Sequence, residues 1–81
     1  MTYSVHYHVG LEAIPEDAQR EIVRIMLQIA EVVSTVPDSS PFWSSMKDSL
    51  LQIDVNRWRV VYRIDPGRRE IHVVELRPAR R

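Results

Sequence analysis

Between residues 51 and 76, three consecutive segments alternate apolar and polar side chains, and this pattern most limits the folds open to the chain. A period of two is typical of a β-strand with one buried face. The three segments are residues 51–55, 58–64 and 70–76. They are separated only by Asn56–Arg57 and by residues 65–69, which contain the turn signal Asp65–Arg68. Steps this short favour tight turns, with Gly67 in the left-handed conformation of the second turn, so the segments are predicted to form an antiparallel meander.

The first half of the chain predicts one more strand and two helices. Residues 3–9 also alternate, and Gly10 ends them. Pro15 is predicted to be the first residue of an amphipathic helix of about 20 residues that stops before Pro37. Its expected core-facing residues are Ala18, Ile22, Ile25, Met26, Ile29, Val32, Val33 and Val36. A short second helix is expected over residues 41–47, capped by Ser40. The buried side chains expected of this second helix are Phe42, Trp43 and Met46.

These elements predict an α+β fold with the order β-α-α-β-β-β in one domain over residues 1–81. The N-terminal strand should join the meander in a single sheet, with the long and the short helix packed on one face. The last strand is apolar on both sides, which places it in the interior of the sheet. The sequence contains no cysteine, so the 44% of hydrophobic residues must supply the stabilising core.

Charge is distributed unevenly although the formal net charge is zero. Residues 1–54 hold eight acidic and three basic residues, a net charge of −5, and residues 55–81 hold three acidic and eight basic residues, a net charge of +5. Such asymmetry suggests a polyanionic or acidic partner for the C-terminal half, and internal charge pairing is the alternative. With no signal-peptide pattern and no apolar run of about 20 residues, the protein is predicted to be cytoplasmic and without a membrane partner.

Residues 58–65, Trp-Arg-Val-Val-Tyr-Arg-Ile-Asp, resemble the third-strand signature of the RelE/ParE toxin superfamily. Residues 51–57 are similar to the strand and hairpin that precede this signature, and residues 71–76 to the final strand. The resemblance implies the toxin of a bacterial type II toxin–antitoxin system, held inactive by a cognate antitoxin protein. In the RelE branch such toxins cleave mRNA on the ribosome. In the ParE branch they inhibit DNA gyrase.

The resemblance to the RelE branch implies that Arg59 contacts the scissile phosphate and that Arg80 is a second catalytic arginine. The expected activity is therefore translation inhibition by an mRNA interferase. The outward positions of the second strand are Gln52 and Asp54 rather than basic residues, and the chain ends at Arg81 without a C-terminal tyrosine or histidine. These two features leave open a non-enzymatic inhibitor of gyrase or another protein, and a family member that has lost its toxicity.

The spacing of the arginines also indicates a site for phosphate groups. A period of two places Arg57, Arg59 and Arg63 on one face of a strand, where guanidinium groups could bind phosphates. The predicted nucleic-acid-binding residues are Arg57, Arg63, Arg77 and Arg81. The alternative is a solvated face whose arginines pair with Asp54 or Glu75 across strands.

Histidine is the side chain that exchanges protons near neutral pH, which makes His72 the candidate acid–base group of the basic half. A strand histidine without a catalytic role is the alternative. His6 and His8 share one strand face at a spacing that can bind a metal, but no third ligand is evident beside them. Neither a metal site nor a cofactor is therefore predicted.

Overall fold

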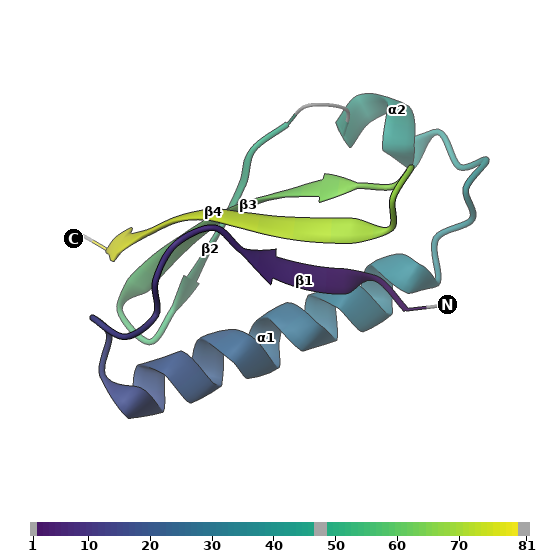
Figure 1. Ribbon diagram of the computed structural model, residues 1–81. Helices are drawn as coiled ribbons and strands as arrows, with labels where there is room; N and C mark the ends of the chain where they lie inside the picture. Colours follow the sequence, from purple (N-terminus) through teal and green to yellow (C-terminus); the bar gives the residue numbers. More distant parts are fainter. Residues whose placement is uncertain (1, 47–48, 80–81) are drawn as a thin grey trace.

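The computed structural model describes residues 2–46 and 49–79 and has the predicted order of elements (Figure 1). The strands and helices are β1 (Ser4–Tyr7), α1 (Glu16–Ser34), α2 (Phe42–Met46), β2 (Leu51–Val55), β3 (Trp58–Asp65) and β4 (Glu70–Pro78). The four strands form one sheet in the order β1-β4-β3-β2. The α+β prediction is confirmed, and β4 lies inside the sheet as its two apolar faces indicated.

The sheet is mixed because the chain crosses over between β1 and the meander. β2, β3 and β4 pair antiparallel, whereas β1 pairs parallel with β4 at the edge. The parallel register places Val5 opposite Ile71 and His6 opposite His72. This direction could not be predicted from local turns, since residues 8–50 separate β1 from the meander.

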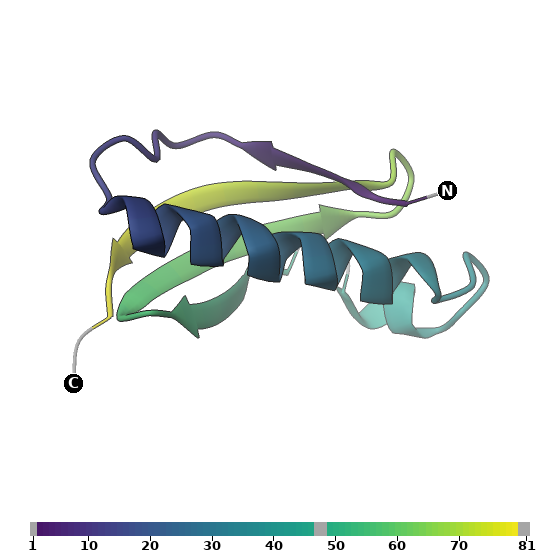
Figure 2. The ribbon, with the colours of Figure 1, turned by 90° about the horizontal axis from the view of Figure 1, so that it is seen from below.

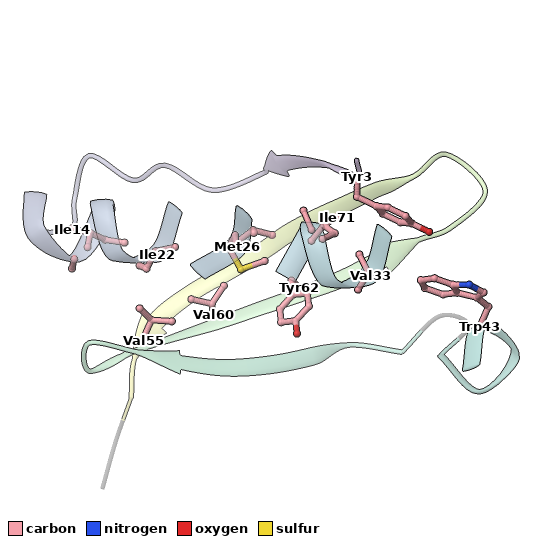
Figure 3. Packing of buried hydrophobic residues seen from close by; sticks show 13 residues of the cluster. Tyr3, Ile14, Ile22, Met26, Val33, Trp43, Val55, Val60, Tyr62 and Ile71 are labelled. Atoms are coloured by element: carbon pink, nitrogen blue, oxygen red, sulfur yellow. The ribbon is translucent and has the colours of Figure 1, made fainter. Parts of the chain in front are cut away.

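The core lies between α1 and one face of the sheet (Figures 2 and 3). Ile22, Met26 and Ala30 of α1 are fully buried against Val60, Ile71 and Val73 of the central strands. Pro15 is the N-cap of α1, one residue before its predicted position as the first helical residue, and Glu16 and Asp17 occupy the first turn. The helical stripe was predicted with one clear error, because Val32 is 66% exposed. Val32 lies on another side of α1 from Ala30 and Val33, which are the buried residues of this turn of the helix.

α2 extends the same core at the end of the sheet where β3 and β4 join. The Ser40 hydroxyl accepts a hydrogen bond from the Phe42 backbone N–H at 3.2 Å, so the predicted cap is present. Trp43 is buried, stacks on the Tyr3 ring at 6.0 Å, and donates its indole N–H to the Pro37 carbonyl at 2.9 Å. The prediction that Phe42 is buried is wrong. Phe42 remains 40% exposed and meets only the edge of the Trp43 ring, because the short helix turns one side to the core.

The two turns of the meander differ in how well they were predicted. Asn56 and Arg57 both have positive φ, 50° and 70°, as a two-residue hairpin turn requires. In the second turn the left-handed residue is Arg69, at a φ of 54°, and the prediction for Gly67 is wrong. The turn lies one residue later than predicted, over residues 66–69 instead of 65–68. Asp65 caps it by accepting a hydrogen bond from the Arg68 N–H at 3.2 Å.

A β-bulge in β4 determines which side chains face solvent near the C-terminus. Tyr62 pairs with Val73 while the preceding Val61 pairs with Glu75, so Val74 is the extra residue of β4. The bulge lets Val74 and Glu75 share the solvent side and returns Leu76 to the core. Strict alternation would instead turn Glu75 and Arg77 toward α1.

In the described part of the chain, neither helix combines the length and apolarity needed to span a bilayer.

Candidate nucleic-acid interface

The outer face of the sheet, defined as the face opposite α1, carries four of the predicted site residues: Arg59, Arg63, His72 and Arg77. It consists of Ser4, His6, Gln52, Asp54, Arg59, Val61, Arg63, Asp65, Glu70, His72, Val74, Glu75 and Arg77, with His8 just beyond β1. Most of these side chains are exposed or half-buried. The prediction that Arg59 and Arg63 share one strand face is confirmed, because both alternate with the core residues of β3.

Arg59 and Arg77 are direct cross-strand partners on this face. The bulge at Val74 makes the pairing possible, since it turns Arg77 to the same side as Arg59. Like charges placed opposite each other repel, so such a pair needs carboxylates or a bound anion nearby. Two guanidinium groups on adjacent strands are therefore suited to binding one phosphate between them.

Each arginine of this pair has a carboxylate partner in the structure. Arg59 donates through Nε to Asp54 Oδ1 at 3.0 Å and through Nη2 to Asp54 Oδ2 at 3.4 Å. The hydrogen bond from Arg59 holds the pKa of the Asp54 carboxyl below its usual value and raises the pKa of Arg59. Arg77 lies 3.4 Å from Glu75. The internal pairing considered in the sequence analysis is thus present, and an incoming phosphate would compete with these carboxylates.

Arg63 has a different environment. It pairs in register with His72, its side chain is exposed, and it takes part in none of the ion pairs formed among residues 2–46 and 49–79. Along β3, four residue steps lead from Arg63, the partner of His72, to Arg59, the partner of Arg77, which is about 13 Å at the usual rise of a strand. The outer face therefore carries two separate groups of basic side chains rather than one continuous cradle.

A groove of about 450 Å³ opens beside Arg63, between α2 and the turn that joins β3 to β4. Trp43, Met46 and Ile64 form apolar parts of its wall, and Arg63 lies among its lining residues. An apolar groove next to an exposed arginine can accept a flat ring with a negatively charged group beside it, such as the base and phosphate of a nucleotide.

The remaining predicted residues lie elsewhere. Arg57 is in the hairpin turn between β2 and β3, exposed, and its carbonyl accepts a hydrogen bond from the Ala79 N–H at 2.9 Å. This bond holds the end of β4 beside Arg57 and near the Arg59–Arg77 pair. Arg80 and Arg81 lie outside the described residues.

Sequence reasoning missed one cluster on the outer face. His6, His8 and His72 gather there with Glu70, because parallel pairing brings β1 beside the start of β4. The i, i+2 spacing of His6 and His8 was the available signal, but the third histidine comes from a strand 64 residues later.

Comparison with known proteins supports the fold assignment. The chain is similar to a chain in the crystal structure of the archaeal RelE–RelB complex from Pyrococcus horikoshii OT3, with a TM-score of 0.59 and 17% sequence identity. The superposition covers 100% of this chain and 99% of that chain. No family model matches the sequence, and no curated protein matches it either. The structure therefore has a RelE-like fold over its whole length.

Proposed function

We propose that this protein is the toxin of a toxin–antitoxin pair and that it inhibits translation by cleaving mRNA on the ribosome. The observation that carries the proposal is the pairing of Arg59 with Arg77 on the open face of a RelE-like sheet. Arg59 is the arginine of the strand signature that resembles this superfamily. Arg63 and Arg57 add exposed cations along the same strand and its preceding turn.

Cleavage without a metal uses the ribose 2′-OH as the nucleophile. The 2′-oxygen loses its proton and bonds to phosphorus while the bond to the 5′-oxygen breaks and that oxygen is protonated, so charge builds up on the phosphate in the transition state. Preorganised cations at that position accelerate the reaction because they bind the transition state more tightly than the ground state. Guanidinium forks match pairs of phosphate oxygens, so Arg59 and Arg77 would hold the scissile phosphate between β3 and β4. Arg80, the second catalytic arginine that the resemblance implies, follows Arg77 closely in the chain and would assist there.

The separation of His72 from this pair limits its role. At about 13 Å along the sheet from Arg77, its imidazole is too far to exchange protons with a phosphate held by Arg59. We therefore assign Arg63 and the adjacent groove to binding a neighbouring part of the RNA, and His72 to no proton transfer at Arg59.

The proposed inhibitor of this toxin is a cognate antitoxin. β1 and β2 are the two edges of the sheet, and edges offer unpaired backbone groups to an added strand. The structure with a similar fold is that of a RelE–RelB complex. An acidic segment of an antitoxin would suit the arginines of the outer face.

Expression in a bacterial host without the antitoxin tests the proposal. The wild type is expected to arrest growth, and primer extension on a reporter mRNA should show ribosome-dependent cuts. Arg59→Ala should lower the cleavage rate by about 10²–10³-fold, the usual loss when one transition-state donor is removed. Arg59→Lys should recover only part of that rate, because a lysine keeps the charge but not the fork.

Arg20→Ala is the matched control, since Arg20 is an exposed arginine of α1, away from the outer face. It should cut and arrest like the wild type. Arrest without cuts would redirect the proposal to gyrase or another protein target. Absence of arrest with a folded protein would indicate a family member that has lost toxicity.

A second prediction concerns the Asp54 carboxylate, which forms an ion pair with Arg59. Asp54→Asn removes the charge that competes with phosphate, and the exposed ion pair it breaks contributes little to folding. Binding of single-stranded RNA should become tighter by about threefold and depend more steeply on salt. Fluorescence anisotropy at several salt concentrations measures both effects, and Asp38→Asn, which frees Arg69 near the opposite end of β3, serves as the control. Unchanged affinity in Asp54→Asn would mean that RNA does not use Arg59.

A further inference from the structure

All three histidines of the chain meet on the outer face beside the first residues of β4. The His72 ring stacks between the other two, with centroid distances of 5.3 Å to His6 and 4.9 Å to His8. The parallel register of β1 and β4 fixes this arrangement by placing His6 directly opposite His72. The side chain of His72 is only 13% exposed, so its ring is held by its neighbours.

Two carboxylates complete the cluster. Glu70 contacts the rings of His72 and His6. Its Oε1 atom lies 3.0 Å from His72 Nε2, and its Oε2 atom lies 3.5 Å from His6 Nε2. Asp65 is the cross-strand partner of Glu70. One potential ligand atom from each of Asp65, Glu70 and His72 lies within 4.8 Å of the others.

These atoms lie close enough together to bind one transition metal after small side-chain movements. Ligands about 2.0–2.1 Å from a tetrahedral zinc ion lie about 3.3 Å from one another. Glu70 Oε1 and His72 Nε2 are 3.0 Å apart, and one ligand atom of each of the three residues lies within 4.8 Å of the others. We propose that Asp65, Glu70 and His72 form a binding site for a divalent transition metal of the zinc class.

The surrounding contacts orient the proposed ligands. His72 Nδ1 lies 2.7 Å from His8 Nε2, so a neutral His72 that donates its Nδ1 proton to His8 would have its Nε2 lone pair available for a metal. Asp65 is held by the hydrogen bond that it accepts from the Arg68 N–H. Metal-binding histidines and carboxylates usually have such outer partners, which fix the tautomer and the direction of the ligand atom. The metal would replace the hydrogen bond between His72 Nε2 and Glu70 Oε1.

The ligand set also defines the class of metal. Imidazole nitrogens combined with carboxylates favour zinc, cobalt or nickel, whereas magnesium prefers oxygen ligands and retains its water. The two carboxylates offset the nearby charge of Arg63, whose exposed side chain can turn toward solvent. A bound ion would join the last residue of β3 to the first residues of β4, across the turn between them. The site is independent of the proposed RNA chemistry, which takes place at the other end of β4.

Isothermal titration of the purified full chain with zinc chloride tests the site, and thermal unfolding gives a second readout. One zinc ion should bind per chain and raise the Tm, because a ligand specific for the folded state stabilises it. Glu70→Gln and His72→Asn should weaken binding by more than the 10–100-fold typical of losing an outer partner. His8→Ala, which removes an outer partner of His72, should weaken zinc binding by about 10–100-fold.

Glu75→Gln is the matched control, because Glu75 is an exposed carboxylate of the same strand, beside Arg77. It should bind zinc like the wild type. No saturable binding, or wild-type binding by Glu70→Gln, would overturn the proposal. Magnesium binding as tight as zinc would also overturn it, because it would exclude a role for the imidazoles. Circular dichroism checks the fold of each variant, and the near-isosteric Glu70→Gln decides the outcome if His72→Asn does not fold.

Discussion

Met26→Ala is expected to lower the free energy of unfolding by about 2–5 kcal/mol, the usual loss for a large buried side chain cut to alanine. Met26 is completely buried near the middle of α1, over the central strands (Figure 3). Deleting its thioether removes contacts with the sheet and leaves a cavity that the rigid β3–β4 pair cannot close. A chain of 81 residues has a total stability of about 4–12 kcal/mol, so the change threatens the fold itself.

Urea denaturation followed by circular dichroism measures this loss. Leu27→Ala is the matched control, since Leu27 is the next residue of the same helix and is 55% exposed. Leucine and alanine are both good helix formers, so the control should change stability by less than about 1 kcal/mol. Equal losses in the two variants would contradict the packing of α1 described above.

Much of this fold could be predicted because local patterns and long-range packing agree. The apolar stripe of α1 follows the helical period, and the meander strands follow the period of two, so each pattern identified its element and its buried face. The errors concern apolar residues at the edge of the buried side of a helix. Val32 of α1 and Phe42 of α2 are exposed, because in each helix the next residue, Val33 or Trp43, faces the core.

The candidate sites depended more on tertiary structure than the elements did. Arg59 could be placed on the outward side of β3 from alternation alone. The partnership of Arg59 with Arg77 could not, because it requires the bulge at Val74, and nothing in the order of residues 70–78 marks that position. The histidine cluster depends on the direction of β1 relative to β4, which is set by packing over α1 and not by any turn.

Val73→Asp is expected to unfold the protein, and it tests the bulge as well as the core. Val73 is fully buried beneath α1 on a central strand. A carboxylate there would lose its hydration without gaining a partner, which costs several kcal/mol, comparable with the whole stability of the domain. The expected result is a chain without a cooperative unfolding transition at 25 °C.

Substitutions at the neighbouring residues are the controls. They distinguish the cost of burying a charge at Val73 from a general intolerance of β4 to charged residues. Val74→Asp should leave the protein folded, at a cost of about 1 kcal/mol for the poor strand propensity of aspartate, because Val74 lies on the outer face. Glu75→Lys should also fold, although strict alternation from Val73 would place residue 75 in the core. Leu76→Asp should destabilise the chain less than Val73→Asp but more than Val74→Asp, because Leu76 is a half-buried residue packed against the core. If Glu75→Lys destabilises the chain more than Leu76→Asp, β4 has no bulge, and Arg77 would face α1 rather than lie beside Arg59.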